Sequence, residues 1–587
     1  MRSKIRWLAL TAAVGGLLVV GVPSSADHAT RTDVKNLTPI ADLSNTDTLA
    51  NSDMAFWGDM AIQGHWEGFQ IHDISTPANP TTIHDYDDCG DPALGLGAGQ
   101  GDVIVWENLL VRGWNSGASA TAFCGRTPAG DPLPISRTGF EGIHIFDITN
   151  PASPQLVGEV DIDDGAASLP SGITTGCGSH TLTAVPDPAS NRLIVYVGGS
   201  SQLCPGMDLV EIPLNNPAAA EWYGRAENPS GRACHDITVY MIDKNRAVCS
   251  GSWPTNNILG NHGFSYWSMD AADGGSLANP VLLYERDISR VNNQTVSDAN
   301  ENGATLGHTS SFSWDGKILL WSSEPGGGIN SNCEESDSDE TREMYFLSAE
   351  LGQLKGKWTT PTQSADESCA SVHIMQSIPT MNGRDVMTSG TYMAGTYLVD
   401  FTDPVTPTTI GWSDPPADVV PAPNPALILG GAWATYWYNG YLYESNIAKG
   451  LFIHQSTSPE AQTPVELEFL NPQTMMPLPP LQPAVKCKGQ DATHVGTSGN
   501  DNIVGTGGKD VIAALGGKDK INAKGGKDLV CAGGGKDRVN GKGGNDRLFG
   551  EGGNDTLNGG AGKKDRCHGG PGKDKAIKCE KEISIER

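Results

Sequence analysis

The feature that most constrains this chain is a nine-residue repeat near its C-terminus, between Gly496 and Asn558. Each unit reads Gly-x-Asp-x-aliphatic, so a glycine stands two residues before an aspartate and an aliphatic residue two after it. The seven aspartates are Asp501, Asp510, Asp519, Asp528, Asp537, Asp546 and Asp555. Glycine permits a positive-φ turn, and the aliphatic position suits a strand of about three residues. The repeat therefore predicts stacked parallel coils, with two units in each coil.

Two units per coil place aspartates 18 residues apart on the same edge of the stack. The expected columns are Asp501, Asp519, Asp537 and Asp555 on one edge, and Asp510, Asp528 and Asp546 on the other. Calcium takes about six to eight oxygen ligands, which carboxylates and turn carbonyls of successive coils can supply. The unit resembles the RTX (hemolysin-type) nonapeptide, which implies a Ca2+-binding parallel β-roll. Because it buries little apolar surface, we expect the segment to be disordered without calcium and to fold on binding it.

Two departures from the family pattern bear on calcium affinity. The second position of most units is not glycine, and in four units the residue before the aspartate is Lys509, Lys518, Lys527 or Lys536. A cation beside a calcium site weakens binding unless its side chain turns into solvent. After Asn558 the register slips, because Asp565 lies ten residues after Asp555, and we expect the ordered sites to end at Asp555. A calcium-free β-solenoid spacer is the alternative reading.

The N-terminus has the pattern of an export signal. Residues 1–6 are basic, residues 7–20 are apolar, and small residues at 24–26 favour cleavage after Ala26, with Ala29 as the alternative. An uncleaved anchor is the alternative. No other stretch of the sequence is long and apolar enough to span a bilayer, so we expect a secreted or cell-surface protein with no membrane span after cleavage.

The twelve cysteines agree with an oxidising destination. Their spacing favours local disulfides, although an all-thiol chain remains open if the host does not oxidise its exported proteins. Cys234–Cys249 and Cys567–Cys579 are close in sequence, and Cys89–Cys124, Cys177–Cys204 and Cys333–Cys369 are plausible pairs, although the sequence does not fix the connectivity.

Charge is distributed unevenly along the chain, whose formal net charge is −28. Residues 487–587 contain 18 Lys plus Arg and 14 Asp plus Glu, a net charge of +4, whereas the remainder contains 22 and 54, a net charge of −32. The acidic remainder argues against nucleic-acid binding. The basic tail could bind an anionic cell-surface polymer or an acidic protein, and a plain solvated surface is the alternative.

Between residues 49 and 470, short β-rich runs separated by turns predict an all-β domain. Residues 68–80, 142–154 and 395–407 share an alternating strand, an aspartate and a polar turn that ends in proline. Weaker copies occur at residues 208–218, 266–280, 344–352 and 450–460. These segments resemble LVIVD repeats, a β-propeller family among exported microbial proteins, and seven copies imply a seven-bladed propeller. The aspartate and proline are interpreted as structural, because Asp accepts backbone N–H bonds and Pro ends a strand.

Four histidines stand immediately before strand-like runs at the starts of presumed blades, namely His180, His235, His308 and His373. The first strands of blades line the channel of a propeller, so the four imidazoles are expected to converge there, where they could bind a transition metal. The residues that could complete such a pocket are Asp236, Glu324, Trp433, Tyr436, Trp437 and Tyr438. The alternative is that each histidine hydrogen-bonds to backbone between neighbouring blades.

The sequence thus predicts five parts: a signal peptide (1–26), an N-terminal segment (27–48), a seven-bladed β-propeller (49–470), a Pro-rich linker (471–486) and a parallel β-roll (487–587). We expect Ca2+ in the roll, and a propeller that acts as a binding or scaffold module at the cell surface or in the medium. The alternative is a metal-dependent oxidase or hydrolase that uses the four-histidine channel. The sequence contains no P-loop, G-x-S-x-G elbow or HExxH motif. A role of the roll in export itself is a further alternative, which the N-terminal signal disfavours.

Overall fold

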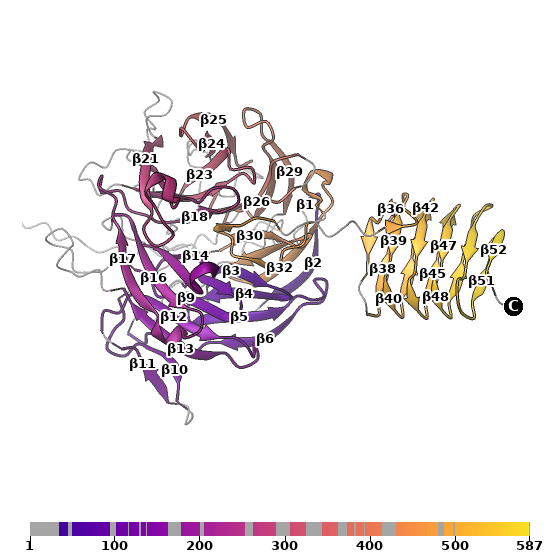
Figure 1. The fold of residues 1–587 in the computed structure, drawn as a ribbon, viewed down its shortest axis with the longest axis horizontal. Helices are drawn as coiled ribbons and strands as arrows, with labels where there is room; N and C mark the ends of the chain where they lie inside the picture. The colour runs from indigo at the N-terminus through magenta and orange to yellow at the C-terminus, as the bar shows by residue number, and fades with distance from the viewer. Residues whose placement is uncertain are drawn as a thin grey trace, which may run out of the picture. The chain divides into compact units, whose positions relative to one another are not determined.

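The computed structural model divides the chain into two compact units, Met1–Pro479 and Pro480–Arg587 (Figure 1). The residues that it describes are 34–44, 50–93, 101–115, 117–127, 131–136, 138–162, 178–199, 205–252, 262–288, 306–324, 343–361, 372–380, 383–392, 394–413, 430–463, 465–478, 486–496 and 499–585. These residues form strands and a few short 3-10 helices, so the all-β prediction is confirmed. In this described part, no helix has the length and apolar character needed to cross a membrane. The predicted signal peptide lies outside the described residues.

The described residues of the first unit form seven four-stranded antiparallel blades, as the repeats predicted. The strands of the first four blades, from innermost to outermost, are β3 (Asn51–Trp57), β4 (Met60–His65), β5 (Gly68–Asp73) and β6 (Thr81–Tyr86); β8 (Val103–Trp106), β9 (Leu109–Gly113), β12 (Gly142–Asp147) and β13 (Gln155–Asp161); β14 (Thr181–Asp187), β15 (Arg192–Gly198), β16 (Met207–Pro213) and β17 (Glu221–Ala226); β18 (Ile237–Tyr240), β19 (Arg246–Ser252), β20 (His262–Ser268) and β21 (Val281–Asp287). Those of the last three are β22 (Leu306–Phe312), β23 (Ile318–Glu324), β24 (Glu343–Ser348) and β25 (Leu354–Thr359); β26 (Ile374–Ile378), β27 (Val386–Gly390), β28 (Thr396–Asp400) and β29 (Thr408–Ser413); β30 (Ala432–Tyr438), β31 (Tyr441–Asn446), β32 (Gly450–Ser456) and β2 (Leu37–Ser44).

The blades close into a ring because their innermost strands contact one another in cyclic order, β3, β8, β14, β18, β22, β26, β30 and back to β3. A separate apolar cluster lies between each pair of neighbouring blades. Between the fifth and sixth blades, for example, Phe346 of β24 packs with Met387, Tyr397 and Val399 of β27 and β28. Both faces of a blade are thus buried, and closure removes the unpaired edges that an open sheet of this size would expose.

The N-terminal segment closes the ring. Strand β2, predicted only as part of an N-terminal segment, is the outermost strand of the seventh blade and pairs antiparallel with β32 from Leu37↔Ser456 to Ser44↔Gly450. The side chain of Leu37 is buried in the cluster between the sixth and seventh blades. The two ends of the propeller sequence therefore share one sheet.

All seven repeat segments found in the sequence overlap the third strand of a blade, namely β5, β12, β16, β20, β24, β28 and β32. The aspartate that ends three of these strands caps the following turn. The Oδ1 atoms of Asp73, Asp147 and Asp400 accept hydrogen bonds from the backbone N–H groups two residues later, at 2.8–3.0 Å. The structural interpretation of this aspartate is confirmed.

Residues 469–476 belong to the propeller unit and not to the linker that we predicted from residue 471 onward. Strand β33 (Phe469–Leu470) pairs with β3, and β34 (Thr474–Met475) pairs in parallel with β18. Between them, the Asn471 side chain bonds to both backbone groups of Val105, and the Gln473 amide donates to Asp53. We call this segment the strap. It crosses the innermost strands of several blades, where its amide side chains serve as hydrogen-bond partners for backbone groups that no neighbouring strand reaches.

Three of the predicted disulfides are present: Cys89–Cys124, Cys234–Cys249 and Cys567–Cys579. The first lies in a small extra sheet of β7 (Cys89–Gly90), β10 (Phe123–Arg126) and β11 (Pro132–Pro134). A fourth bridge, Cys487–Cys531, was not predicted because its cysteines are 44 residues apart. The predicted pairs Cys177–Cys204 and Cys333–Cys369 lie outside the described residues.

The second unit is a parallel β-roll, as predicted. One face consists of β37 (His494–Val495), β39 (Val511–Ala513), β43 (Leu529–Cys531), β47 (Arg547–Phe549), β50 (Arg566–His568) and β52 (Lys581–Ile583). The other consists of β38 (Asn502–Val504), β41 (Lys520–Asn522), β45 (Arg538–Asn540), β49 (Thr556–Asn558) and β51 (Lys575–Ile577). Ile503 lies beside Ile521, and Ile521 beside Val539, so one coil takes 18 residues. The aliphatic position of each unit points inward and forms the core.

Candidate calcium columns and a candidate metal centre

The turns between the strands of the roll place the aspartates. Gly535 and Gly544 have φ of 143° and 132°, and a Cβ on either would lie within 1.5 Å of a carbonyl oxygen of the preceding coil. Only glycine allows this approach, which explains why it recurs two residues before each aspartate. At the second position of the unit, Leu515, Lys524, Lys542 and Glu551 have φ of 66–69°. The turn therefore keeps its shape without the glycine of the family pattern.

The aspartates form the two predicted columns. Each backbone N–H donates to Oδ1 of the aspartate one coil later, as in Asp519 to Asp537 at 2.8 Å and Asp537 to Asp555 at 2.9 Å. The second column repeats the pattern, with Asp528 donating to Asp546 at 3.0 Å. One carboxylate oxygen of each residue is thus used to join successive coils.

The second carboxylate oxygen is buried and, among the described residues, accepts no hydrogen bond. These orphaned atoms are Oδ2 of Asp519, Asp528, Asp537, Asp546, Asp555, Asp565 and Asp574. An ionised oxygen in this position has lost its water and gained no donor, which is unfavourable unless a cation binds it. The residues present therefore fit calcium, which bare carboxylate oxygens at turns would hold together with turn carbonyls.

The first aspartates of the columns differ from the others. Both oxygens of Asp510 accept hydrogen bonds from the backbone or side chain of Thr506. Asp501 is only half-buried. Five of the seven predicted aspartates therefore present a buried, unpartnered oxygen.

Two ligand candidates were missed in the sequence, where we expected the ordered sites to end at Asp555. Asp565 and Asp574 continue the columns, because Asp546 and Asp555 donate to their Oδ1 atoms at 2.8 Å. Strand β50 pairs with β47 at an offset of 19 residues, so the turn before Asp565 absorbs the extra residue. The signal for these sites was the glycine-rich turn and the aliphatic strand position that persist after the slip.

The lysines that precede the aspartates do not enter the columns. Lys509, Lys518, Lys527 and Lys536 are exposed, whereas the aspartates that follow them are buried. Because these lysines are exposed, their ammonium groups remain in water. There they are screened and compete weakly with a bound cation.

Burial and the neighbouring carboxylates raise the pKa of Asp519, Asp528 and Asp537. The same causes raise the pKa of Asp546 and Asp555 to about 6, each against neighbours in both adjacent coils. Without calcium, the aspartate carboxyl groups of the columns therefore ionise less readily than free aspartates do.

The four predicted histidines lie together in the propeller. His180 and His373 directly precede the innermost strands β14 and β26. His235 lies two residues before β18, and His308 lies in β22. Their rings form a continuous row, with centroids 4.3 Å apart from His180 to His235, 4.5 Å to His308 and 4.4 Å to His373. All four side chains are buried. We call this row the histidine cluster.

Two of the four histidines make the inter-blade hydrogen bonds of the alternative reading. Nδ1 of His308 lies 2.9 Å from the carbonyl oxygen of His373, and Nδ1 of His373 lies 2.7 Å from that of Trp433. A carbonyl only accepts, so both Nδ1 atoms carry the proton and both Nε2 atoms carry a lone pair. His235 instead pairs through Nδ1 with Oδ1 of Asp236 at 3.0 Å.

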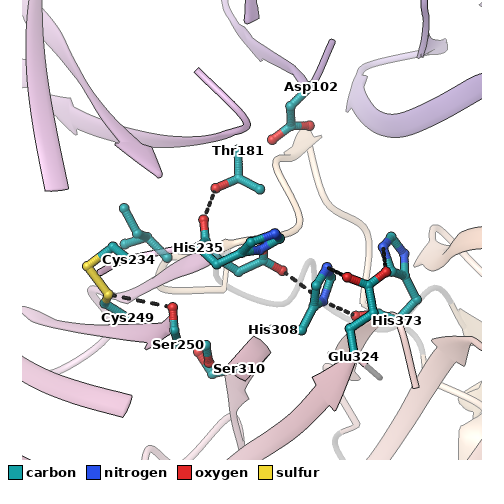
Figure 2. A network of polar contacts seen from close by, with 12 residues as sticks. Asp102, Thr181, Cys234, His235, Cys249, Ser250, His308, Ser310, Glu324 and His373 are labelled. Atoms are coloured by element: carbon teal, nitrogen blue, oxygen red, sulfur yellow. Dashed lines mark hydrogen bonds and ion pairs between the residues drawn. A yellow bond between two sulfur atoms is a disulfide. The ribbon is translucent and has the colours of Figure 1, made fainter. Parts of the chain in front are cut away.

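Buried carboxylates lie beside the histidine cluster, and Figure 2 shows Glu324 next to His308 and His373. Glu324, at the end of β23, lies between His308 and His373 and accepts a hydrogen bond from Tyr392. Burial raises the pKa of Glu324 and of Asp236, and lowers the pKa of His308 to about 4 and of His373 to about 3. The imidazoles are therefore neutral and able to act as ligands.

Of the four aromatic residues predicted to complete the pocket, Trp433 packs against the histidine cluster and the other three make different contacts. The ring of Trp433 packs on His373 with centroids 4.3 Å apart. Tyr436 instead donates to Asp53, Trp437 packs between the sixth and seventh blades, and Tyr438 donates to the carbonyl of Gly58. Successive strand residues point to opposite faces, so a run of four cannot line one site.

Two buried carboxylates at the inner strands were not predicted. Asp53 binds Tyr436 and Gln473 of the strap, and Oδ2 of Asp102 accepts from the backbone N–H of Leu182 at 2.6 Å. Burial raises the pKa of Asp53 to about 6, and burial together with Asp53 raises that of Asp102 well above its usual value. Neither residue had a motif that could have identified it.

The fold and the carboxylate columns define the class of protein: a β-propeller joined to a calcium-binding β-solenoid. Two family models match the chain. The RTX calcium-binding nonapeptide repeat (4 copies) matches residues 495–530 and 532–563, and the LVIVD repeat matches residues 53–88 and 139–162. The chain therefore carries LVIVD repeats and RTX calcium-binding repeats, and the latter imply calcium binding. These repeats and the disulfides are features of extracellular proteins.

Among curated proteins, no sequence matches the chain. Among solved structures, the computationally designed Ika8 protein is 10% identical with a TM-score of 0.33, over 71% of this chain and 99% of that chain. The N-terminal domain of Nup159 is 8% identical with a TM-score of 0.37, over 72% of this chain and 94% of that chain.

Proposed function

We propose that this is an exported calcium-binding protein whose roll folds on calcium and whose propeller is a binding module at the cell surface or in the medium. The observation that carries the proposal is the pair of columns of buried, unpartnered carboxylate oxygens in the roll. Without an ion, these oxygens repel one another within a unit whose apolar core holds about one aliphatic side chain from each nine-residue repeat and a few alanines. Calcium removes the repulsion and joins successive coils.

The N-terminal pattern and the disulfides support export of the protein. Basic, apolar and small residues follow one another in residues 1–26 as in an export signal. Calcium sites of extracellular modules bind at roughly 0.1–1 mM, a concentration that calcium reaches outside cells and not in the cytoplasm. Export would therefore switch the roll from unfolded to folded.

The partner that suits the roll best is an anionic cell-surface polymer. Lys518 and Lys536 lie one coil apart on one edge and Lys509 and Lys527 on the other, and all four are exposed. Calcium adds positive charge to a segment whose net charge is already +4. The acidic propeller, by contrast, suits a protein or glycan recognised by shape at its loops.

A calcium titration of residues 480–587, followed by far-UV circular dichroism, tests the proposal. The fragment has its own core and contains both halves of two disulfides, so it is a sound folding unit. We expect a transition from coil to β-structure with calcium, and none with an equal concentration of magnesium. No transition up to about 10 mM calcium, beyond the weak extracellular range, would contradict the proposal.

Calcium binding by the roll is expected to weaken in acid. The pKa of Asp546 and Asp555 is raised to about 6, so protons compete for these carboxylates below that pH. From pH 7 to pH 5 the calcium midpoint of the titration should rise by at least ~10-fold. Without calcium, pH has the opposite effect on the stability of the roll. Because the pKa of these carboxyl groups is raised in the folded state, the calcium-free roll is more stable at pH 5 than at pH 7. A midpoint that does not change between these pH values would contradict this assignment.

Metal-dependent catalysis is the second candidate function of the propeller, as an oxidase or a hydrolase. The observation in its favour is that two groups of ionisable side chains, His235–Asp236–His308 and His308–Glu324–His373, have ligand atoms within 4.8 Å of one another. Turnover that depends on an added transition metal and is lost with the ligands would favour this candidate over the binding module.

A further inference from the structure

The contacts of Glu324 with two histidines are not explained by hydrogen bonding. Oε2 of Glu324 lies 3.6 Å from Nε2 of His308, and Oε1 lies 3.7 Å from Nε2 of His373 (Figure 2). Both distances exceed those of N–H···O hydrogen bonds. Because the Nδ1–H groups of both rings donate to backbone carbonyls, each Nε2 presents a lone pair to the carboxylate. Two imidazole acceptors therefore face a third acceptor in a buried place.

A single proton does not relieve the contact between these three hydrogen-bond acceptors. One proton on Glu324 would serve one of the two Nε2 atoms and leave the other facing an oxygen. Tyr392 already donates to Oε1, so the oxygen on the side of His373 has its donor. A metal ion accepts electron pairs from both nitrogens and from the carboxylate at once. Ligand atoms at ~2.1 Å from a tetrahedral ion lie ~3.4 Å apart, close to the separations found here.

We infer that the propeller binds one divalent first-row transition-metal ion through Nε2 of His308, Nε2 of His373 and the carboxylate of Glu324. Two imidazoles and one carboxylate suit Zn2+, Mn2+ or Fe2+, whereas Ca2+ prefers ligands that are all oxygen. The site and the roll therefore select different ions. The inference does not depend on calcium binding by the roll, and it holds whether the ion is structural or catalytic.

Neighbouring backbone and side-chain groups orient the three ligands. The carbonyls of His373 and Trp433 fix the tautomer and the rotation of the two rings, and Tyr392 fixes Glu324. Outer partners of this kind accompany histidine ligands in most metal sites. The three ligands come from β22, β23 and the residue before β26, so neighbouring blades hold them at a fixed spacing.

The second group, His235 and Asp236, lies on the other side of His308. Oδ2 of Asp236 is buried, has no hydrogen bond among the described residues, and lies 3.7 Å from Nδ1 of His308. Since that Nδ1–H is directed to the carbonyl of His373, Asp236 and His235 support the orientation and charge of His308 and do not form a second centre. One ion per chain is therefore expected.

Metal analysis of the untagged full chain tests the inference. The protein is saturated with calcium to occupy the roll, incubated with an excess of Zn2+, and dialysed against metal-free buffer that contains calcium. Inductively coupled plasma mass spectrometry should find about one zinc per chain. Co2+ in place of zinc should give the visible absorption bands of an imidazole-ligated ion.

The variants separate ligand loss from loss of folding. His308→Asn and His373→Asn keep a donor near the position of Nδ1 and remove Nε2, and Glu324→Gln keeps the size and the acceptor for Tyr392. Each should lower zinc retention at least tenfold. His454→Asn is the matched control, since His454 is equally buried, pairs with Glu444 at 3.1 Å and lies in the third strand β32. It should keep one zinc per chain.

Three outcomes would overturn the inference. They are a wild-type protein that retains less than about one fifth of an equivalent of zinc, retention that survives His373→Asn and Glu324→Gln, and loss of zinc in His454→Asn to the same degree. If the variants do not fold, pulsed electron paramagnetic resonance of Cu2+ bound to the wild-type chain decides. Two coupled imidazoles are expected, and none would refute the site. A calcium titration of the same samples reports on the roll separately.

Discussion

A chain that lacks residues 1–45 is expected to lose the folded propeller. Its missing strand, β2, supplies the fourth strand of the seventh blade and buries Leu37 between two blades. Loss of about seven ladder positions at roughly 1 kcal/mol each approaches the whole stability of a typical domain. Near-UV circular dichroism should show no tertiary signal, or the protein should be insoluble.

The matched control is a chain that begins at Val34, which keeps β1 (Val34–Lys35) and β2. It should melt within a few degrees of the full chain. A shortened chain without β2 that melts cooperatively at the wild-type temperature would show that the ring does not need this closure.

Asp537→Asn in the roll is expected to raise the calcium midpoint by at least ~10-fold and to broaden the transition. Asp537 lies in the middle of its column and contacts the coils of Asp519 and Asp555. Asparagine keeps the acceptor that joins the coils but replaces the orphaned Oδ2 with an amide N–H2, which repels a cation. The measurement is the calcium titration of residues 480–587.

The neighbouring Lys536→Gln is the control for this substitution. Lys536 is exposed and points away from the column, so its replacement should change the midpoint less than about twofold, in the direction of tighter binding. If Asp537→Asn titrates like the wild type, or if both variants shift equally, the column is not the calcium site.

The histidines show what position in a repeat can predict. Each was placed at the start of an innermost strand by the spacing of the repeats, and the structure brings all four into one row. The spacing could not say which atoms meet. Glu324 lies at the end of a second strand, 49 residues before His373, and the packing of the fifth blade against the sixth brings the two to 3.7 Å.

The periodic parts of this protein could be predicted from the amino-acid sequence alone. Nine-residue spacing fixes the coil, the two aspartate columns and the inward aliphatic positions, because each depends only on residues within one or two coils. The seven third strands followed from local repeats for the same reason. The residue preferences of turns and strands act over a few neighbouring residues, so these features can be predicted from the sequence.

Contacts between residues that are far apart in the sequence could not be predicted and became apparent in the folded structure. Strand β2 joins β32 across more than 400 residues, the strap joins Asn471 to Val105 across 366, and Cys487 finds Cys531 in another coil. No periodicity links these residues. They meet because the packing of blades into a ring and the stacking of coils bring distant parts of the chain together.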